Sequence, residues 1–203
     1  MAKSNPYQAA QAALVLNHLV LDVGEINAEA LTRFCNDPQS EERTKVTELF
    51  TAKAKKVSIL EYLFTRWHPA IKEFVVCNKF VVDTSDTAEL KISCLGTNFE
   101  NWFLGKVEKD VGACEVKVSK LLRRSLDKPI LDELGGTAEK ALAHVYKFLK
   151  SADHNSWYIF YVKDVSDVLR AVSARWSGDG WHVGARSVEY PIEWLDGFQV
   201  VSR

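Results

Sequence analysis

The chain has 203 residues, of which 47% are hydrophobic and 26% are charged, as in ordinary globular proteins. Lysine and arginine number 26 and aspartate and glutamate 27, so the formal net charge is -1 and the chain lacks the overall basic excess of nucleic-acid-binding proteins. The length suits one large domain or two small ones.

The four cysteines are far apart in the chain and form no C-x-x-C pair. Because zinc ligands usually come in close pairs, we expect neither a metal site nor a cofactor. Their apolar neighbours, as in FVVCN and KISCL, predict buried and reduced thiols, which favours a cytoplasmic protein.

Residues 1–72 are predicted to be mainly helical. Pro6 suits the first turn of a helix that ends at Gly24, and two shorter helices follow over 27–35 and from Ser40. Polar residues interrupt the first apolar run, which is also much shorter than a membrane span of roughly 20 residues. We therefore expect neither a signal peptide nor membrane attachment. The region closes with an aromatic segment over 60–68.

Residues 73–203 are predicted to form an α+β domain. The alternative is that both regions belong to a single domain, so the position of the boundary between them is left open. Two β-branched runs flank a polar turn and indicate a hairpin, and three segments have helical apolar spacing. The hairpin strands are 74–82 and 89–95, and the helices begin at Asn98 and cover 115–126 and 137–150.

The last quarter of the chain changes to period-2 patterns that predict four strands. These cover 157–163, 168–176, 180–188 and 198–202. Gly178-Asp179 fits a two-residue turn, which places Trp176 opposite Trp181 on an apolar face. We expect both tryptophans to be mostly buried, because such pairs usually build a sheet.

The polar face of this hairpin holds the candidate binding residues. That face holds Arg175, His182 and Arg186, which could form an anion site. The commoner explanation is an ordinary surface histidine between two arginines that binds no anion. Trp194 lies in the following connection and is expected to be partly exposed at the sheet edge. No catalytic residue is assigned, because the chain has no G-x-S-x-G or comparable nucleophile motif.

A basic stripe is the main indication of a different ligand. It consists of Lys117, Lys120, Arg123, Arg124 and Lys128. On a helix these residues would lie along one face and could contact successive phosphates. The simpler interpretation is a solvated helix face, which the neutral net charge favours.

Several segments of the chain resemble a group of uncharacterised bacterial proteins. They are VVDTSDTAELKIS, LGTNFENWFLGKVE, SLDKPILDELGG and YIFYVKD…LRAVSARWSGDGWHVGARSVEYPIEWLDGFQVVSR. That group has a C-terminal core of the form IFYV-D…L-AV…W…GW-V-A-SV--P--W--G--V-SR, preceded by a longer Gly-rich turn that is reduced here to SADHNS. The resemblance covers residues 81–203 and implies a self-contained folded unit. It implies no function, cofactor or catalytic residue.

These patterns predict an α+β fold, with a helical N-terminal part followed by a helix-packed antiparallel sheet that ends in a meander. The leading hypothesis for function is a non-enzymatic binding protein whose partner is another protein or a second copy of the chain. One alternative is a nucleic-acid-associated protein that uses the basic residues at 117–128. Another is an enzyme whose site is assembled from dispersed polar residues.

Overall fold

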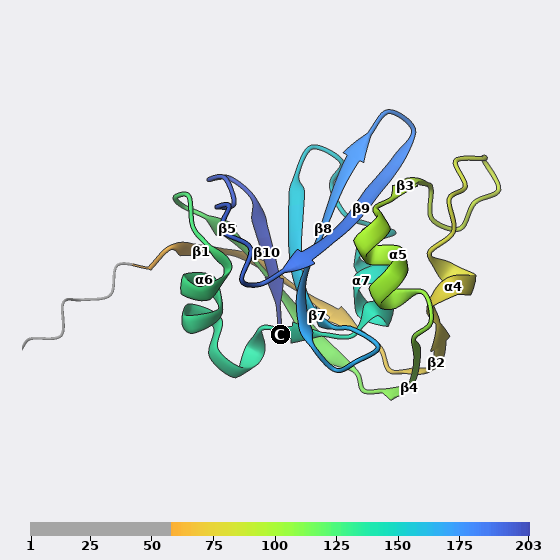
Figure 1. Ribbon diagram of the computed structural model, residues 1–203, viewed down its shortest axis with the longest axis horizontal. Helices are drawn as coiled ribbons and strands as arrows, with labels where there is room; N and C mark the ends of the chain where they lie inside the picture. Colours follow the sequence, from red (N-terminus) through yellow and green to blue (C-terminus); the bar gives the residue numbers. More distant parts are fainter. Residues whose placement is uncertain (1–57) are drawn as a thin grey trace, which may run out of the picture. The chain divides into compact units, whose positions relative to one another are not determined.

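The computed structural model describes residues 58–203, which form one compact unit (Figure 1). In this part of the chain 44% of the residues lie in strands and 21% in helices. The prediction of an α+β fold with a helical N-terminal part and an antiparallel sheet is therefore wrong: the unit is mostly β and its main sheet is mixed. The helices predicted before residue 57 lie outside the described residues.

The main sheet has eight strands, seven of them in the order β1-β5-β10-β7-β8-β9-β3, while β6 pairs with β7. Strand β10 runs parallel to β7, and β3 runs parallel to β9, which makes the sheet mixed. The strands are β1 (Leu60–His68), β3 (Ile92–Leu95), β5 (Cys114–Leu121), β6 (Glu139–Lys140), β7 (Trp157–Lys163), β8 (Leu169–Ser177), β9 (Gly180–Ser187) and β10 (Gln199–Ser202).

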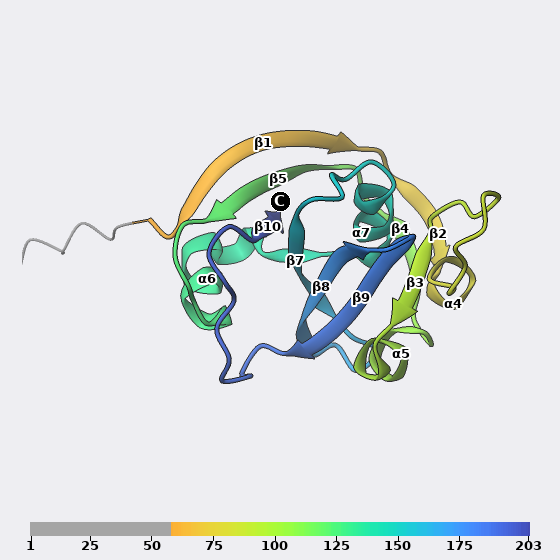
Figure 2. The same ribbon diagram turned by 90° about the horizontal axis from the view of Figure 1, so that it is seen from above.

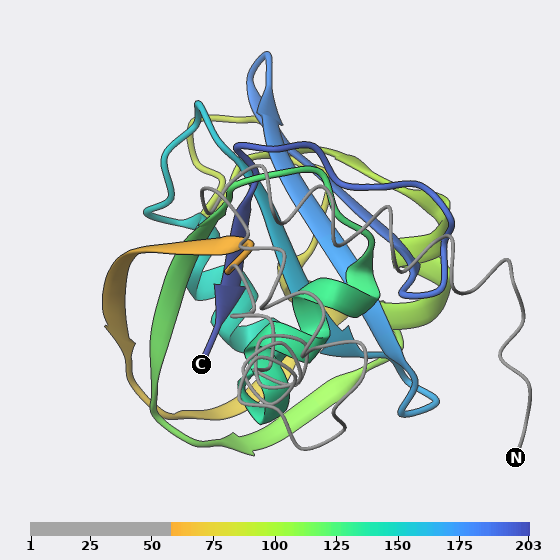
Figure 3. The same cartoon turned by 90° about the vertical axis from the view of Figure 1, so that its left-hand side faces the viewer.

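A second sheet pairs β2 (Ile71–Val75) with β4 (Val107–Val111) in antiparallel fashion. Strand β2 follows β1 after two residues, and β5 follows β4 after two residues. The pair β1–β5 and the pair β2–β4 are therefore two parts of one long two-stranded ribbon. The ribbon bends at Pro69 and at Gly112, and Figures 2 and 3 show it curving around the rest of the unit. The segment over 60–68, expected in a helical region, is thus a strand of this ribbon.

The helices are short and lie between the strands. They are α4 (Val76–Lys79), α5 (Thr97–Phe103), α6 (Asp127–Leu134), a 3-10 turn over Gly135–Thr137 and α7 (Leu142–Leu149). The helix predicted from Asn98 is confirmed as α5, although Asn98 does not cap it and instead donates from Nδ2 to the carbonyl of Ala185. The helix predicted over 137–150 begins only at Leu142, because β6 occupies Glu139–Lys140.

Two predictions in the middle of the chain are wrong. The segment over 115–126 is mainly strand β5, in which buried Val116 and Val118 alternate with exposed Glu115 and Lys117. This period of two is the strand signal, and it outweighs the i, i+3 pattern of the lysines. The hairpin over 74–82 and 89–95 also does not form, because β2 pairs with β4 and β3 pairs with β9.

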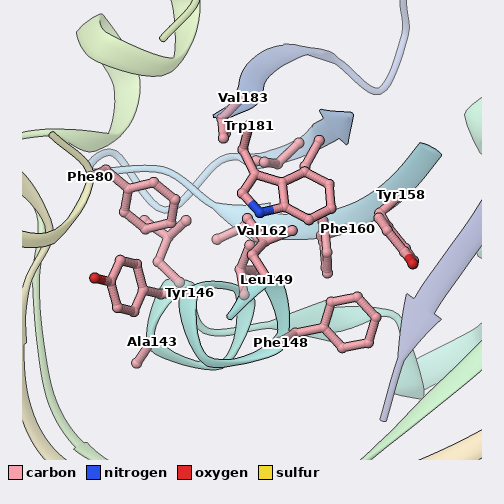
Figure 4. Packing of buried hydrophobic residues seen from close by; sticks show 14 of the residues in the cluster. Phe80, Ala143, Tyr146, Phe148, Leu149, Tyr158, Phe160, Val162, Trp181 and Val183 are labelled. Carbon is pink, nitrogen blue, oxygen red and sulfur yellow. The ribbon is translucent and has the colours of Figure 1, made fainter. Parts of the chain in front are cut away.

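Two separate clusters pack against the two faces of the main sheet. The larger cluster lies under α5 and α7 and includes Trp181, Phe160 and Phe148 (Figure 4). The smaller one lies against α6 and includes Ile159, Tyr161 and Ile130. Alternate residues of β7 enter the two clusters, as expected for a central strand.

The register of the C-terminal hairpin is confirmed. Trp176 lies opposite Trp181, and Arg175 lies opposite His182. The turn has Gly178 at a φ of 68°, which suits a glycine in the first central position of a type II′ turn. Trp181 is completely buried, whereas Trp176 is partly exposed and stacks on His154 with ring centroids 3.7 Å apart.

Candidate functional site

Two of the predicted binding residues meet around the buried carboxylate of Asp127. The indole Nε1 of Trp194 donates to Asp127 Oδ1 at 2.7 Å, and Arg186 donates to Oδ2 at 2.8 Å. The Arg186 guanidinium also lies 3.5 Å from the centre of the Trp194 ring. The hydroxyl of Tyr161 donates to Oδ1 at 2.9 Å, and burial together with Asp127 raises the pKa of Tyr161.

This cluster is structural, because its main polar groups are directed at one another. Asp127 has no exposed surface, and only 15% of the Arg186 side chain is exposed. The expectation that Trp194 is partly exposed is wrong, since 7% of it is accessible. A buried indole needs a partner for its N–H, and Asp127 provides it from a position 67 residues away.

The other two predicted residues lie together near the hairpin tip. Arg175 and His182 face each other across β8 and β9, both partly exposed. The Arg175 guanidinium stacks over Trp157 at 4.8 Å, and Arg175 forms no ion pair with any described residue. The structure thus splits the four predicted residues into a buried pair and a partly exposed pair.

The basic residues do not form the expected helix face. Lys117 and Lys120 are three residues apart on strand β5, so their side chains leave opposite faces of the sheet. Arg123 and Arg124 follow in an exposed connection, and Lys128 lies on α6, where it pairs with Asp132 at 3.2 Å. These residues therefore offer no single row of cations to a phosphate backbone.

The most exposed apolar residues of the unit lie on β1, an edge of the main sheet in the described part of the chain. Tyr62 is 62% exposed and Trp67 is 64% exposed, and Leu63 and Phe64 are also accessible. Large apolar side chains that are exposed on an edge strand often mark an interaction site. The sequence shows the aromatic segment, but its position at an edge depends on strand order, which a single sequence does not give.

Tyr62 and Trp67 belong to one face of the ribbon, which we call the β1 aromatic face. Tyr62 lies opposite Ser119, Thr65 opposite Lys117, and Trp67 opposite Glu115. Leu63 is an extra residue in β1 that has no partner on β5, so Tyr62 and Thr65 emerge on the same side, where their hydroxyls are 3.0 Å apart. The face thus combines two aromatic rings with one acidic and one basic neighbour.

The described residues 58–203 contain no set of histidine, cysteine or acidic side chains arranged to hold a metal ion. None of the helices found in the same part of the chain is long and apolar enough to cross a membrane. Comparison with known proteins gave no match to a family model, a curated protein or a solved structure.

Proposed function

We propose that the protein is a binding protein that takes up an extended segment of a protein partner along β1. The observation that carries this proposal is the exposure of Tyr62 and Trp67 on an edge strand. Aromatic side chains are enriched among residues that dominate binding energy in protein interfaces.

An edge strand also has backbone N–H and C=O groups that are free to pair with another strand. A partner segment that extends the sheet would pair with these groups and place alternate side chains against the β1 aromatic face. Because Glu115 and Lys117 flank this face with opposite charges, it suits a partner segment of low net charge. A nucleic acid fits less well, since the basic residues are scattered over both sides of β5 and beyond.

The unpaired Arg175 with His182 remains a second candidate surface, and its chemistry differs. A guanidinium without an acidic partner would favour an anionic ligand over an apolar strand. Substitutions at the two surfaces therefore separate the two hypotheses.

A random peptide display library provides a probe that requires no knowledge of the partner. We expect selection on the full chain to enrich peptides with apolar residues at alternate positions. Replacing Tyr62 and Trp67 together by serine should weaken their binding at least about tenfold, because aromatic residues at an interface centre often contribute 2 kcal/mol or more. The bound peptide should slow hydrogen exchange of β1 amides.

The matched control replaces Tyr190 and Ile192, an aromatic and an aliphatic residue that are 46% and 56% exposed in the connection before β10. This double serine variant should bind the peptides as the unmodified chain does. Enrichment of acidic peptides whose binding is lost in Arg175→Glu would instead assign binding to the hairpin. The nucleic-acid alternative predicts that the chain binds a generic single strand of DNA. It also predicts that the double variant Lys117→Glu with Lys128→Glu abolishes this binding.

A further inference from the structure

A cluster of titratable side chains surrounds Cys114 at the bend of the ribbon. Cys114 is the first residue of β5 and is partly exposed. Its Sγ lies 3.8 Å from Nδ1 of His144 and 4.0 Å from Nζ of Lys140. His68, the last residue of β1, lies directly across from Cys114 in the register. The three neighbours are buried, so the thiol is the member of the cluster that solvent reaches best.

The hydrogen bonds of His144 determine which of its nitrogens faces the thiol. Nε2 is 2.9 Å from the carbonyl oxygen of Gly112, which can only accept, so Nε2 carries the proton. Burial and the Lys140 charge lower the pKa of His144 to about 4, and the ring is therefore neutral near pH 7. Nδ1 is then an acceptor and receives the hydrogen bond of the Cys114 S–H group.

Lys140 supplies a positive charge and an exchangeable proton to the same sulfur. Lys140 is 3% exposed, and its ammonium also donates to the carbonyl of Glu115 at 3.4 Å. Burial lowers the pKa of Lys140 to about 8, and Arg203 and Lys117 add to this shift. A lysine in this range exchanges its proton near neutral pH, and its cationic form stabilises a thiolate beside it.

His68 adds an unpartnered buried polar atom to the same cluster. It is 1% exposed, stacks on His144 with centroids 5.6 Å apart, and its Nδ1 has no hydrogen-bond partner. An unsatisfied polar atom in a buried position is unusual in a folded protein. A hydroperoxide has both a donor and acceptors, so it can satisfy Nδ1 in either tautomer of His68.

We propose that Cys114 is a reactive thiol that a small hydroperoxide oxidises to sulfenic acid. The sulfur attacks one peroxide oxygen, so that an S–O bond forms while the O–O bond breaks. The sulfur loses two electrons and the peroxide is reduced to an alcohol, or to water for hydrogen peroxide. The thiol proton passes to solvent, which reaches the partly exposed sulfur, as the thiolate forms beside the Lys140 ammonium. This ammonium gives a proton to the leaving oxygen and regains one from solvent, which balances the step.

Cys77 and Cys94 provide internal controls within the same molecule. Both are exposed and belong to other elements, Cys77 to α4 and Cys94 to β3. Among residues 58–203, no lysine or histidine nitrogen forms a hydrogen bond with either sulfur, and Cys77 Sγ hydrogen-bonds only to the side chain of Asn78. Exposure alone predicts that these two thiols react faster than Cys114, whereas the cluster predicts the opposite order.

The test exposes the full chain to hydrogen peroxide with an excess of dimedone, which traps sulfenic acid, and follows each cysteine by mass spectrometry. We expect Cys114 to be labelled at least tenfold faster than Cys77 and Cys94. Lys140→Met, which keeps the chain length but removes the charge, should lower the Cys114 rate about tenfold. Lys140→Arg should retain more of that rate, since it keeps the positive charge.

Lys147→Met is the control for Lys140→Met, because it removes a lysine from neighbouring α7 without removing a contact to the sulfur. It should leave the Cys114 rate unchanged. A variant that unfolds would raise labelling at all cysteines together and lose its near-ultraviolet circular dichroism, and His144→Gln then replaces it as the test. The proposal is wrong if Cys114 reacts no faster than Cys77 and Cys94, or if a folded Lys140 or His144 variant keeps the full rate.

Discussion

The Trp194 indole donates a hydrogen bond of 2.7 Å to the carboxylate of Asp127, across 67 residues of sequence. This bond joins the connection before β10 to the first residue of α6. The backbones of Ser125 and Trp194 form an isolated bridge beside it, with N···O distances of 3.2 and 2.8 Å. Asp127 thereby organises one end of the smaller core, and its loss should affect the whole unit.

Asp127→Asn should lower the free energy of unfolding by about 3–5 kcal/mol. The substitution preserves size, but it leaves the Arg186 charge buried without a counter-ion and turns one acceptor into a donor. Urea unfolding of the variant and of the unmodified chain measures the effect.

Asp132→Asn is the matched control on the same helix. Asp132 is exposed and, within the described part of the chain, pairs only with Lys128, so its loss should change stability by less than about 0.5 kcal/mol. Equal effects at the two positions would show that the Asp127 cluster does not stabilise the fold.

The two tryptophans of the hairpin should differ in their contribution to stability. Trp181 is fully buried in the larger core, so Trp181→Ala should destabilise the unit by about 3–5 kcal/mol. Trp176 is partly exposed and rests on His154, and Trp176→Ala should lose roughly 1–2 kcal/mol. Thermal unfolding of both variants tests the order, and a larger loss at Trp176 would contradict it.

Local patterns predicted the C-terminal hairpin because its register depends on one turn. Gly178-Asp179 and the alternation of Trp176, Ala174 and Val172 determine every pair between β8 and β9. The other strand pairs are not local. Strand β3 finds its partner β9 almost ninety positions later, for example where Ile92 lies opposite Trp181, and no short-range signal encodes that choice.

In the candidate sites, too, local patterns predicted the contacts within one hairpin but not the contacts between distant segments. The sequence grouped Arg175, His182 and Arg186 correctly on one hairpin face, but it gave no sign that Asp127 would bury Arg186. The Cys114 cluster was also missed, because its members come from β1, β5, β6 and α7. The isolated cysteine and histidines resemble core residues until the fold brings them together.

Gly180 is expected to tolerate no larger side chain, because β3 passes directly over it. A Cβ at this position would lie 2.7 Å from the backbone nitrogen of Ser93. Gly180→Ala must therefore push β3 away from β9, and it should destabilise the unit by about 1–3 kcal/mol. Gly136→Ala is the control, since a Cβ there meets nothing within 4 Å. Denaturant unfolding that gave both variants the same stability would contradict the close approach.

Glu108 should stabilise α7 although it belongs to β4. Its buried carboxylate accepts hydrogen bonds from the backbone N–H groups of Leu142 and Ala143 at 3.0 and 2.9 Å. The helix lacks a capping side chain of its own, because its N-cap residue is Ala141. Glu108→Ala should lower stability by about 1–3 kcal/mol, and hydrogen exchange should accelerate first at the start of α7. Unchanged exchange at Leu142 and Ala143 would exclude this capping role.

Acid should destabilise the unit through His68 and His144 well before most carboxylates titrate. Burial, together with nearby positive charge, lowers the pKa of each histidine to about 4, from an ordinary value of 6.5. Between these values the unfolded chain binds more protons than the folded one, so stability is complete above about pH 6.5 and falls toward pH 4. The cations that face the pair are Arg66 from β1, Lys140 from β6, Lys147 from α7 and Arg203 after β10.

The loss should approach about 1.4 kcal/mol per pH unit for each histidine within this window. Replacing His68 and His144 by glutamine removes both titrations, so the double variant, although less stable at pH 7, should show a flatter dependence between pH 6.5 and 4.5. Replacing His182, which is partly exposed, is the control and should leave the slope unchanged. Urea unfolding at several pH values gives the slopes. A double variant with the slope of the unmodified chain would mean that groups other than His68 and His144 cause the acid sensitivity, because the double variant lacks both titrations.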